Sequence, residues 1–124
     1  MKNSALNWFE IAVALADFDR AKAFYEEALG ESLNTVEGQR KMAIFPYVAE
    51  KGTGGALVGS DEAKPGPGGT MIYLNVEGDL DGVISRIPEA GGKIVQPRTA
   101  IPPNGFIAIF NDTEGNIIGL HSME

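Results

Sequence analysis

The stretch WFEIAVALADFDRAKAFYEEALG, residues 8–30, decides the fold, because a later stretch repeats its pattern. The second stretch is GTMIYLNVEGDLDGVISRIPEAGG, residues 69–92. Each contains a short apolar strand, an acidic turn, an amphipathic helix of about three turns and a glycine stop. Aligning Gly30 with Gly91 gives an offset of 61 residues, at which the apolar positions of the two strands coincide in phase. The sequence therefore predicts a duplication.

The repeat continues beyond the helices, in segments that read as strands. GGALVGS at 54–60 matches GNIIGLH at 115–121 at the same offset of 61 residues. MAIF at 42–45 resembles IAIF at 107–110 at an offset of 65 residues. Each copy therefore has the order β-α-β-β-β, which predicts an α+β protein with mixed sheets.

This order divides the chain into two similar modules within one domain. The first module is expected over about 6–60 and the second over about 70–122, within a single domain that spans residues 1–124. The segment between them, DEAKPGPGG at 61–69, is a linker, because its glycines and prolines disfavour regular structure.

Local signals set the expected bounds of the first elements in each module. We expect a strand over 8–15, followed by a helix with Asp17 as its N-cap. The second module is expected to have a strand over 71–76 and a helix from about 79 to 90. Pro88 falls inside this helix, where it removes a backbone donor, so we expect a kink or an early end.

Composition excludes several classes of function. Among the 124 residues, 44% are hydrophobic and 22% are charged, which is typical of a globular domain. A formal net charge of −7 argues against binding to nucleic acid or to anionic lipid. The absence of cysteine excludes disulfides and thiolate chemistry and fits a cytoplasmic protein. The apolar run at 11–16 is too short for a signal sequence or a membrane span.

Strand alternation gives each sheet two different faces. The helix-facing positions of the first strand are apolar, and we assign Phe9, Ile11, Val13 and Leu15 to them. The opposite face mixes apolar side chains with isolated polar ones, a composition typical of a small-molecule cleft. Its expected members are Trp8, Glu10, Ala12, Ala14, Ala56, Val58, Ser60, Met71, Tyr73, Asn75, Ile117, Gly119 and His121.

Five residues of this opposite face are candidates for ligand binding. Trp8 suits stacking on a ligand or packing against the other module, and Tyr73 and Asn75 suit hydrogen bonding. Glu10 is either a general base, with a pKa raised by burial beside Trp8, or a carboxylate paired with a lysine or arginine. His121 is either a hydrogen-bonded structural residue or, if it contacts Glu10, half of a catalytic acid–base pair.

Three longer motifs carry a family resemblance: DFDRAKAFYEEALG at 17–30, EAGGKIVQP at 89–97 and FIAIFNDTEGNIIGLHS at 106–122. Together they resemble the vicinal oxygen chelate superfamily, which includes glyoxalase I, bleomycin-resistance proteins and extradiol dioxygenases. The end of the chain is similar to a bacterial glyoxalase-like branch. The resemblance covers about residues 6–122. It implies two βαβββ modules whose sheets curl around a cleft, commonly within a homodimer.

The resemblance also implies which positions would hold a metal ion. Members that use a metal place ligands at positions that correspond here to Glu10, Val58, Met71 and Gly119. Only Glu10 offers a donor for a hard or borderline divalent ion, and His121 lies one inward position beyond Gly119. Catalytic metals normally hold three protein ligands, so we expect no metal cofactor.

Three functional hypotheses remain open from the sequence. The first is metal-independent binding of a small organic molecule, oriented by Glu10, Asn75 and His121. The second is a lyase or isomerase similar to lactoylglutathione lyase, with Glu10 as base and a divalent metal held partly by His121. The third is a dimeric module without a small ligand. In each case we expect a homodimer that binds neither nucleic acid nor membrane.

Overall fold

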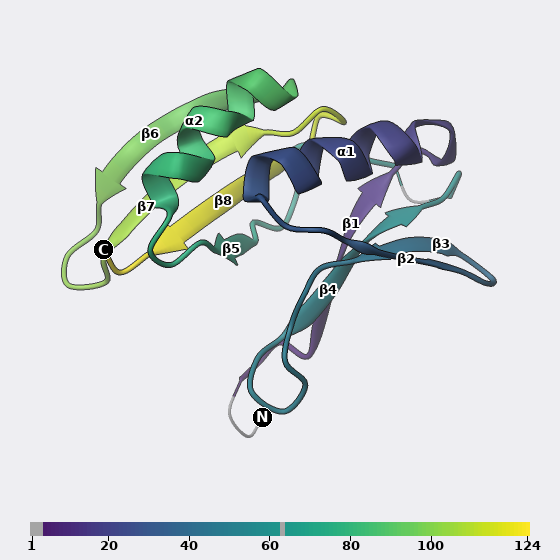
Figure 1. The fold of residues 1–124 in the computed structure, drawn as a ribbon, viewed down its shortest axis with the longest axis horizontal. Helices are drawn as coiled ribbons and strands as arrows, with labels where there is room; N and C mark the ends of the chain where they lie inside the picture. The colour runs from purple at the N-terminus through teal and green to yellow at the C-terminus, as the bar shows by residue number, and fades with distance from the viewer. Residues whose placement is uncertain (1–3, 63) are drawn as a thin grey trace.

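The computed structural model describes residues 4–62 and 64–124, and its strands form two four-stranded sheets over these residues (Figure 1). Sheet A has the order β1 (Trp8–Val13), β4 (Gly54–Gly59), β3 (Lys41–Ile44) and β2 (Asn34–Glu37). Sheet B has the order β5 (Tyr73–Asn75), β8 (Ile117–Ser122), β7 (Phe106–Asn111) and β6 (Lys93–Ala100). The two orders are the same, so the predicted duplication and the α+β class are confirmed.

Strand direction is also the same in the two sheets. In sheet A, β1 runs parallel to β4, with Trp8 beside Gly54, and the other pairs are antiparallel. In sheet B, β5 runs parallel to β8, with Tyr73 beside Gly119, and the remaining pairs are again antiparallel. A parallel pair requires a crossover connection, and in each module the helix supplies it. The predicted mixed sheets are therefore confirmed.

The helices are α1 (Phe18–Leu29) and α2 (Leu80–Ala90), and each ends at a glycine in the left-handed conformation. Gly30 has a φ of 70° and Gly91 a φ of 109°, which residues with a side chain rarely adopt. The expected early end of the second helix is wrong, because α2 continues two residues past Pro88. Pro88 lies in the last turn of α2. Because proline has no backbone N–H, the helix lacks only one backbone hydrogen bond there.

The start of the first helix differs from expectation in two ways. Asp17 holds the N-cap position, but its side chain makes no capping hydrogen bond within the described part of the chain and instead pairs with Arg20 at 3.2 Å. The strand ends at Val13, and Leu15 begins a short 3₁₀ helix, η1 (Leu15–Asp17), where it is 45% exposed. The assignment of Leu15 to the helix-facing side of a strand is therefore wrong.

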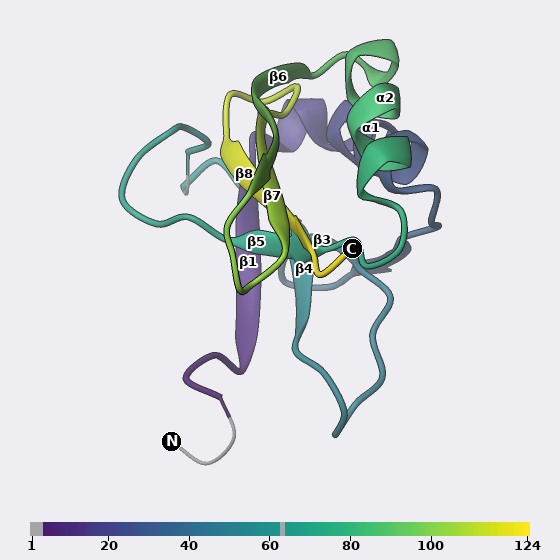
Figure 2. The same ribbon diagram turned by 90° about the vertical axis from the view of Figure 1, so that its left-hand side faces the viewer.

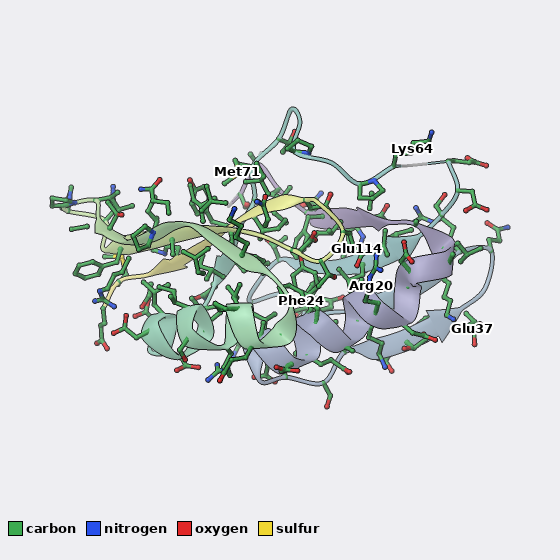
Figure 3. All side chains as sticks on the ribbon, turned by 90° about the horizontal axis from the view of Figure 1, so that it is seen from above. Arg20, Phe24, Glu37, Lys64, Met71 and Glu114 are labelled. Atoms are coloured by element: carbon green, nitrogen blue, oxygen red, sulfur yellow. The ribbon has the colours of Figure 1, made fainter. Side chains whose placement is uncertain are left out.

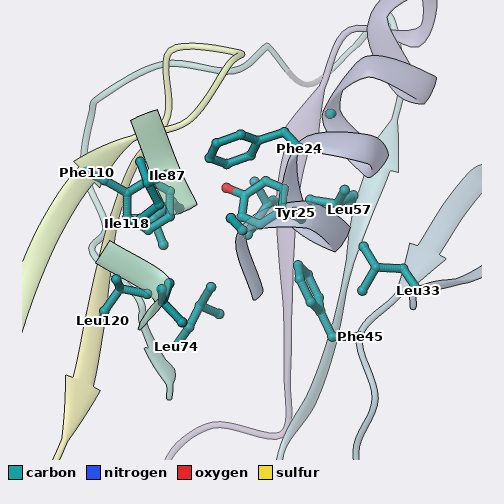
Figure 4. Close-up of a cluster of buried hydrophobic side chains, with 14 of the residues drawn as sticks. Phe24, Tyr25, Leu33, Phe45, Leu57, Leu74, Ile87, Phe110, Ile118 and Leu120 are labelled. Atoms are coloured by element: carbon teal, nitrogen blue, oxygen red, sulfur yellow. The ribbon is translucent and has the colours of Figure 1, made fainter. Parts of the chain in front are cut away.

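Both helices lie on the same side of the two sheets, as Figure 2 shows in a second view. Phe24 and Tyr25 of α1 pack against Phe110 of β7, and the core that they form crosses the boundary between the modules (Figure 4). We call the sheet surfaces directed away from the helices the outer faces. Figure 3 shows Met71 on this side, opposite the helices. No helix within the described residues is long and apolar enough to cross a membrane.

A buried polar network joins the modules inside this core. The Tyr25 hydroxyl donates to Asp112 Oδ2 at 2.8 Å, and Asn116 Nδ2 donates to the same oxygen at 3.0 Å. Asn116 Nδ2 also donates to the carbonyl of Ala12 on β1 at 2.9 Å. Burial, followed by the nearby Asp112 carboxylate, raises the pKa of Tyr25 well above its ordinary value, so the hydroxyl keeps its proton and remains a donor.

Two arginines strengthen the same boundary. Arg20 of α1 binds Glu114, in the turn between β7 and β8, through two hydrogen bonds of 2.9 and 3.1 Å. Burial raises the pKa of Glu114, but the hydrogen bonds from Arg20 and Thr113 outweigh it, and the pKa lies below its ordinary value. Arg86 of α2 donates to the Ala28 carbonyl at 3.1 Å, near the end of α1. Each arginine therefore ties one module to the other.

We predict that Tyr25→Phe lowers the free energy of unfolding by about 1.5–3 kcal/mol, the range for a hydrogen bond to a charged group. The substitution removes only the hydroxyl and leaves Asp112 buried with one donor fewer. Urea denaturation followed by circular dichroism measures the change. Tyr47→Phe is the matched control, since Tyr47 is 47% exposed. An equal effect of both substitutions would show that the buried network does not hold the modules together.

Candidate functional site

The outer face of sheet A carries an ion pair beside an aromatic ring. Arg40, in the turn between β2 and β3, donates to both carboxylate oxygens of Glu10 on β1, at 2.9 and 2.8 Å. The Trp8 indole Nε1 donates to Glu10 Oε2 at 3.2 Å. Arg40 Nη2 also lies 3.9 Å from the sulfur of Met42. The guanidinium is thus held on the Glu10 carboxylate in a bidentate geometry.

This pairing decides between the two interpretations of Glu10. The hydrogen bonds from Arg40 lower the pKa of Glu10, burial opposes them weakly, and the Trp8 N–H lowers the pKa further. The raised pKa expected for a general base is therefore wrong, and the paired carboxylate is the interpretation that the structure supports. Glu10 is ionised at neutral pH and is a weaker base than a free glutamate.

The position of Trp8 depends on a glycine of the neighbouring strand. A Cβ atom on Gly54 would lie 2.9 Å from the Trp8 ring and 2.8 Å from the Tyr47 ring, closer than packing allows. The two rings meet edge to face with their centroids 6.0 Å apart. Trp8 remains 36% exposed, so part of the indole can contact a ligand.

The predicted site residues of sheet B form a second group. The Tyr73 ring covers Gly119, because a Cβ on Gly119 would lie 2.3 Å from it. Asn75 stands beside His121 in the register of β5 and β8. The Asn75 side-chain oxygen accepts from the Glu77 backbone N–H at 3.0 Å, in a local turn.

His121 has a partner other than Glu10. Its Nε2 donates to the backbone carbonyl of Asn104 at 2.6 Å, in the loop between β6 and β7. Within the described residues, no hydrogen bond joins His121 to Glu10, which is bound by Arg40 and Trp8. The acid–base pair required a contact between these two side chains, so the observed geometry does not assemble it.

The donors at the four metal-ligand positions do not fit a divalent metal ion. Glu10 is engaged by Arg40, Val58 is buried and apolar, and Met71 offers only a thioether. The remaining position, Gly119, lies under the Tyr73 ring. Among the described residues, no three His, Cys, Asp or Glu side chains are arranged to hold an ion.

A groove of about 920 Å³ lies between the modules, and we call it the intermodule groove. One wall is β5 with its flanking residues, and the other is the end of sheet A with the loop between β3 and β4. Tyr73 and Asn75 line the groove, whereas Trp8, Glu10 and His121 are not among its lining residues in the described chain. The five predicted ligand-binding residues are thus divided between two surfaces.

Two features of the site escaped the sequence analysis. Arg40 lies outside the repeated segments of the sequence, although alternation along β3 from Met42 back to position 40 puts it on the outer face. No local sequence pattern indicates the intermodule groove, because its two walls are far apart in the sequence and meet only when the modules pack together.

The chain belongs to the Glyoxalase/Bleomycin resistance protein/Dioxygenase superfamily, whose model matches residues 6–120. This membership confirms the resemblance found in the sequence. A search of curated proteins finds no match.

Several solved structures share the fold. A glyoxalase/bleomycin resistance protein from Catenulispora acidiphila is 26% identical with a TM-score of 0.66, over 97% of this chain and 100% of that one. A hypothetical protein from S. aureus is 24% identical with a TM-score of 0.68, over 98% of this chain and 95% of that one. The fosfomycin resistance protein FosX from Listeria monocytogenes is 17% identical with a TM-score of 0.66, over 96% of this chain and 93% of that one.

We predict that Arg40→Met raises the pKa of Glu10. The native pKa is lowered, so the contribution of this pair to stability is present above about pH 4.3 and is lost as the pH falls through the lower folded value. Trp8 is the only tryptophan and bonds to Glu10, so its fluorescence reports the protonation of that carboxylate.

The measured quantity is the midpoint of the Trp8 fluorescence titration, with circular dichroism confirming that the protein stays folded. The midpoint should lie below about 4.3 in the native protein and at or above this value in the variant. Identical midpoints would show that Arg40 does not set the charge of Glu10.

Proposed function

We propose that this chain is a metal-independent member of its superfamily that binds a small organic molecule on the outer face of sheet A. The observation that carries the proposal is the exposed edge of Trp8 beside the fixed Glu10–Arg40 pair. An aromatic surface adjoining a few oriented polar groups is the usual composition of a small-molecule site. Tyr73, Asn75 and His121 are proposed as further ligand contacts from sheet B.

The available donors favour a ligand with an acceptor group next to an apolar part. A guanidinium has five N–H bonds, and two of those of Arg40 bond to Glu10. The Arg40 side chain is 51% exposed, so its outward N–H bonds face solvent. A carboxylate or phosphate oxygen on the ligand would accept from them while its apolar part covers Trp8.

The low basicity of Glu10 supports binding over the lyase or isomerase alternative. That alternative requires Glu10 to take a proton from a substrate, and its pairing with Arg40 lowers its affinity for protons. In the binding proposal the same pairing is useful, because it holds the guanidinium in a fixed orientation before the ligand arrives.

We expect small aromatic carboxylates, screened as a set by thermal shift, to include compounds that raise the melting temperature and change Trp8 fluorescence. Arg40→Met should weaken binding of these compounds about tenfold or more, the loss of one charge-assisted contact. Arg98→Met is the matched control, because Arg98 also pairs with an exposed carboxylate, that of Asp81, at 3.2 Å. Equal affinities in the two variants would exclude Arg40 from the site.

Metal independence has its own test. Elemental analysis of protein purified without a chelator should find no stoichiometric zinc, nickel or manganese. Glu10→Gln should leave the result unchanged, since Glu10 is bound by Arg40. A stoichiometric metal that disappears in Glu10→Gln would instead favour the lyase or isomerase alternative.

We further propose a homodimer in which the outer faces of two copies meet. Trp8, Val36, Met71 and Tyr73 are large apolar residues on or beside these faces, and all are between 36% and 47% exposed. Exposed apolar side chains on the outer faces of both sheets are typical of an interface between proteins. Pairing of the outer faces would also enclose the ligand site, as the cleft implied by the family resemblance requires.

Analytical ultracentrifugation should find a dimer, and Met71→Glu should shift it toward monomer because a charge would enter the apolar interface. Val48→Glu is the control, since Val48 is 63% exposed in the loop between β3 and β4. A monomeric native protein at micromolar concentration would contradict the proposed dimer.

A further inference from the structure

We propose that the intermodule groove is a second binding site that takes a bulky organic cation with aromatic groups. It adjoins the outer face at Met71, Tyr73 and Asn75, but Trp8, Glu10 and Arg40 are not among its lining residues in the described chain. Its volume of about 920 Å³ lies within the range of small-molecule sites, about 300–1,000 Å³. The groove lies between two modules whose relative position is fixed by the Asp112 network and by Arg86. The space is therefore part of the folded architecture.

Aromatic rings from both modules line the groove. Phe9, Phe45 and Tyr47 come from the first module and Tyr73 from the second. Other apolar side chains complete the walls, among them Leu29 from the first module and Met71 and Val83 from the second. Walls of this kind bind apolar bodies, and the faces of the aromatic rings also attract cations.

Two of the rings are held in place before any ligand binds. The Phe9 ring lies against Gly55, where a Cβ would approach it to 2.3 Å, and its centroid is 5.7 Å from that of Phe45. Phe45 in turn packs edge to face on Tyr25 at 5.7 Å. Because Tyr25 belongs to the buried network, this part of the wall is preorganised, which reduces the entropy lost on binding.

The charges along the groove favour a cation. Glu31 and Glu77 line the groove together with a single basic residue, Lys51, within the described chain. Asp79 also lines it, but Arg86 neutralises that carboxylate at 2.6 Å. The carboxylate charge therefore exceeds the ammonium charge, and the formal net charge of −7 adds a long-range attraction for cations.

Tetraphenylphosphonium and tetraphenylborate are suitable probes, because they share shape and apolar surface and differ in the sign of their charge. Isothermal titration calorimetry on the native protein should find tetraphenylphosphonium bound at least about tenfold more tightly than tetraphenylborate. Trp8 fluorescence should change on binding, since Tyr47 lines the groove and contacts the Trp8 ring. Equal affinity for the two ions, or no binding of the cation at millimolar concentration, would overturn the proposal.

Charge reversal locates the site. Glu31→Lys should weaken the binding of tetraphenylphosphonium about three- to tenfold, because it replaces an attraction at the groove by a repulsion. Glu89→Lys makes the same change at an exposed position of α2 that is outside the described lining of the groove, and affinity should stay within twofold. Equal losses of affinity in the two variants would show that binding of the cation depends only on the net charge of the protein, and would overturn the groove as its site.

Arg40→Met separates this inference from the proposed function. Arg40 does not line the described groove, so the variant should bind tetraphenylphosphonium as the native protein does while losing affinity for aromatic carboxylates. Loss of both ligands in Arg40→Met would show that they share the outer face and would overturn the second site. If Arg40→Met keeps its affinity for both ligands, the result would count against the outer-face site and would leave the groove proposal supported.

Discussion

Asp112 is a carboxylate buried between the two modules, and the placement of the modules relative to each other depends on its hydrogen bonds. A buried charge is tolerated only when donors surround it, and here the Tyr25 hydroxyl and both the side chain and the backbone of Asn116 provide them. Because Asn116 also donates to Ala12 on β1, the network fixes sheet B against sheet A. The angle between the sheets sets both the extent of the outer faces and the shape of the intermodule groove.

The outer face of sheet A shows how one pairing changes the chemistry of a position. By the family resemblance, Glu10 stands at a position that holds a ligand in members that use a metal. In this chain a guanidinium occupies the carboxylate, lowers its pKa and leaves an oriented donor beside an exposed indole. Tyr73 lies over Gly119, another of these positions. The fold of the superfamily is therefore retained, while the described residues at these positions are not a donor set that suits a divalent metal ion.

Contacts between a glycine and an aromatic ring occur at both the outer faces and the intermodule groove. Gly54 accommodates Trp8 and Tyr47, Gly55 accommodates Phe9, and Gly119 accommodates Tyr73. In each case a Cβ would approach the ring closer than packing allows, so the absence of a side chain determines where the aromatic surface lies. These contacts link the backbone of the parallel strands to the walls of both proposed sites.

The sequence by itself determined the duplication, the order of elements and the strand faces, because periodicity and glycine stops are local and each copy carries them. It also placed Trp8 and Glu10 on one face, since alternation along a strand depends only on neighbouring residues. Only the tertiary structure decided that Arg40 reaches Glu10, that His121 bonds to Asn104 and that a groove separates the modules. These features depend on how side chains and helices distant in the chain pack together, and the balance between burial and pairing that sets the pKa of Glu10 exists only once that packing is formed.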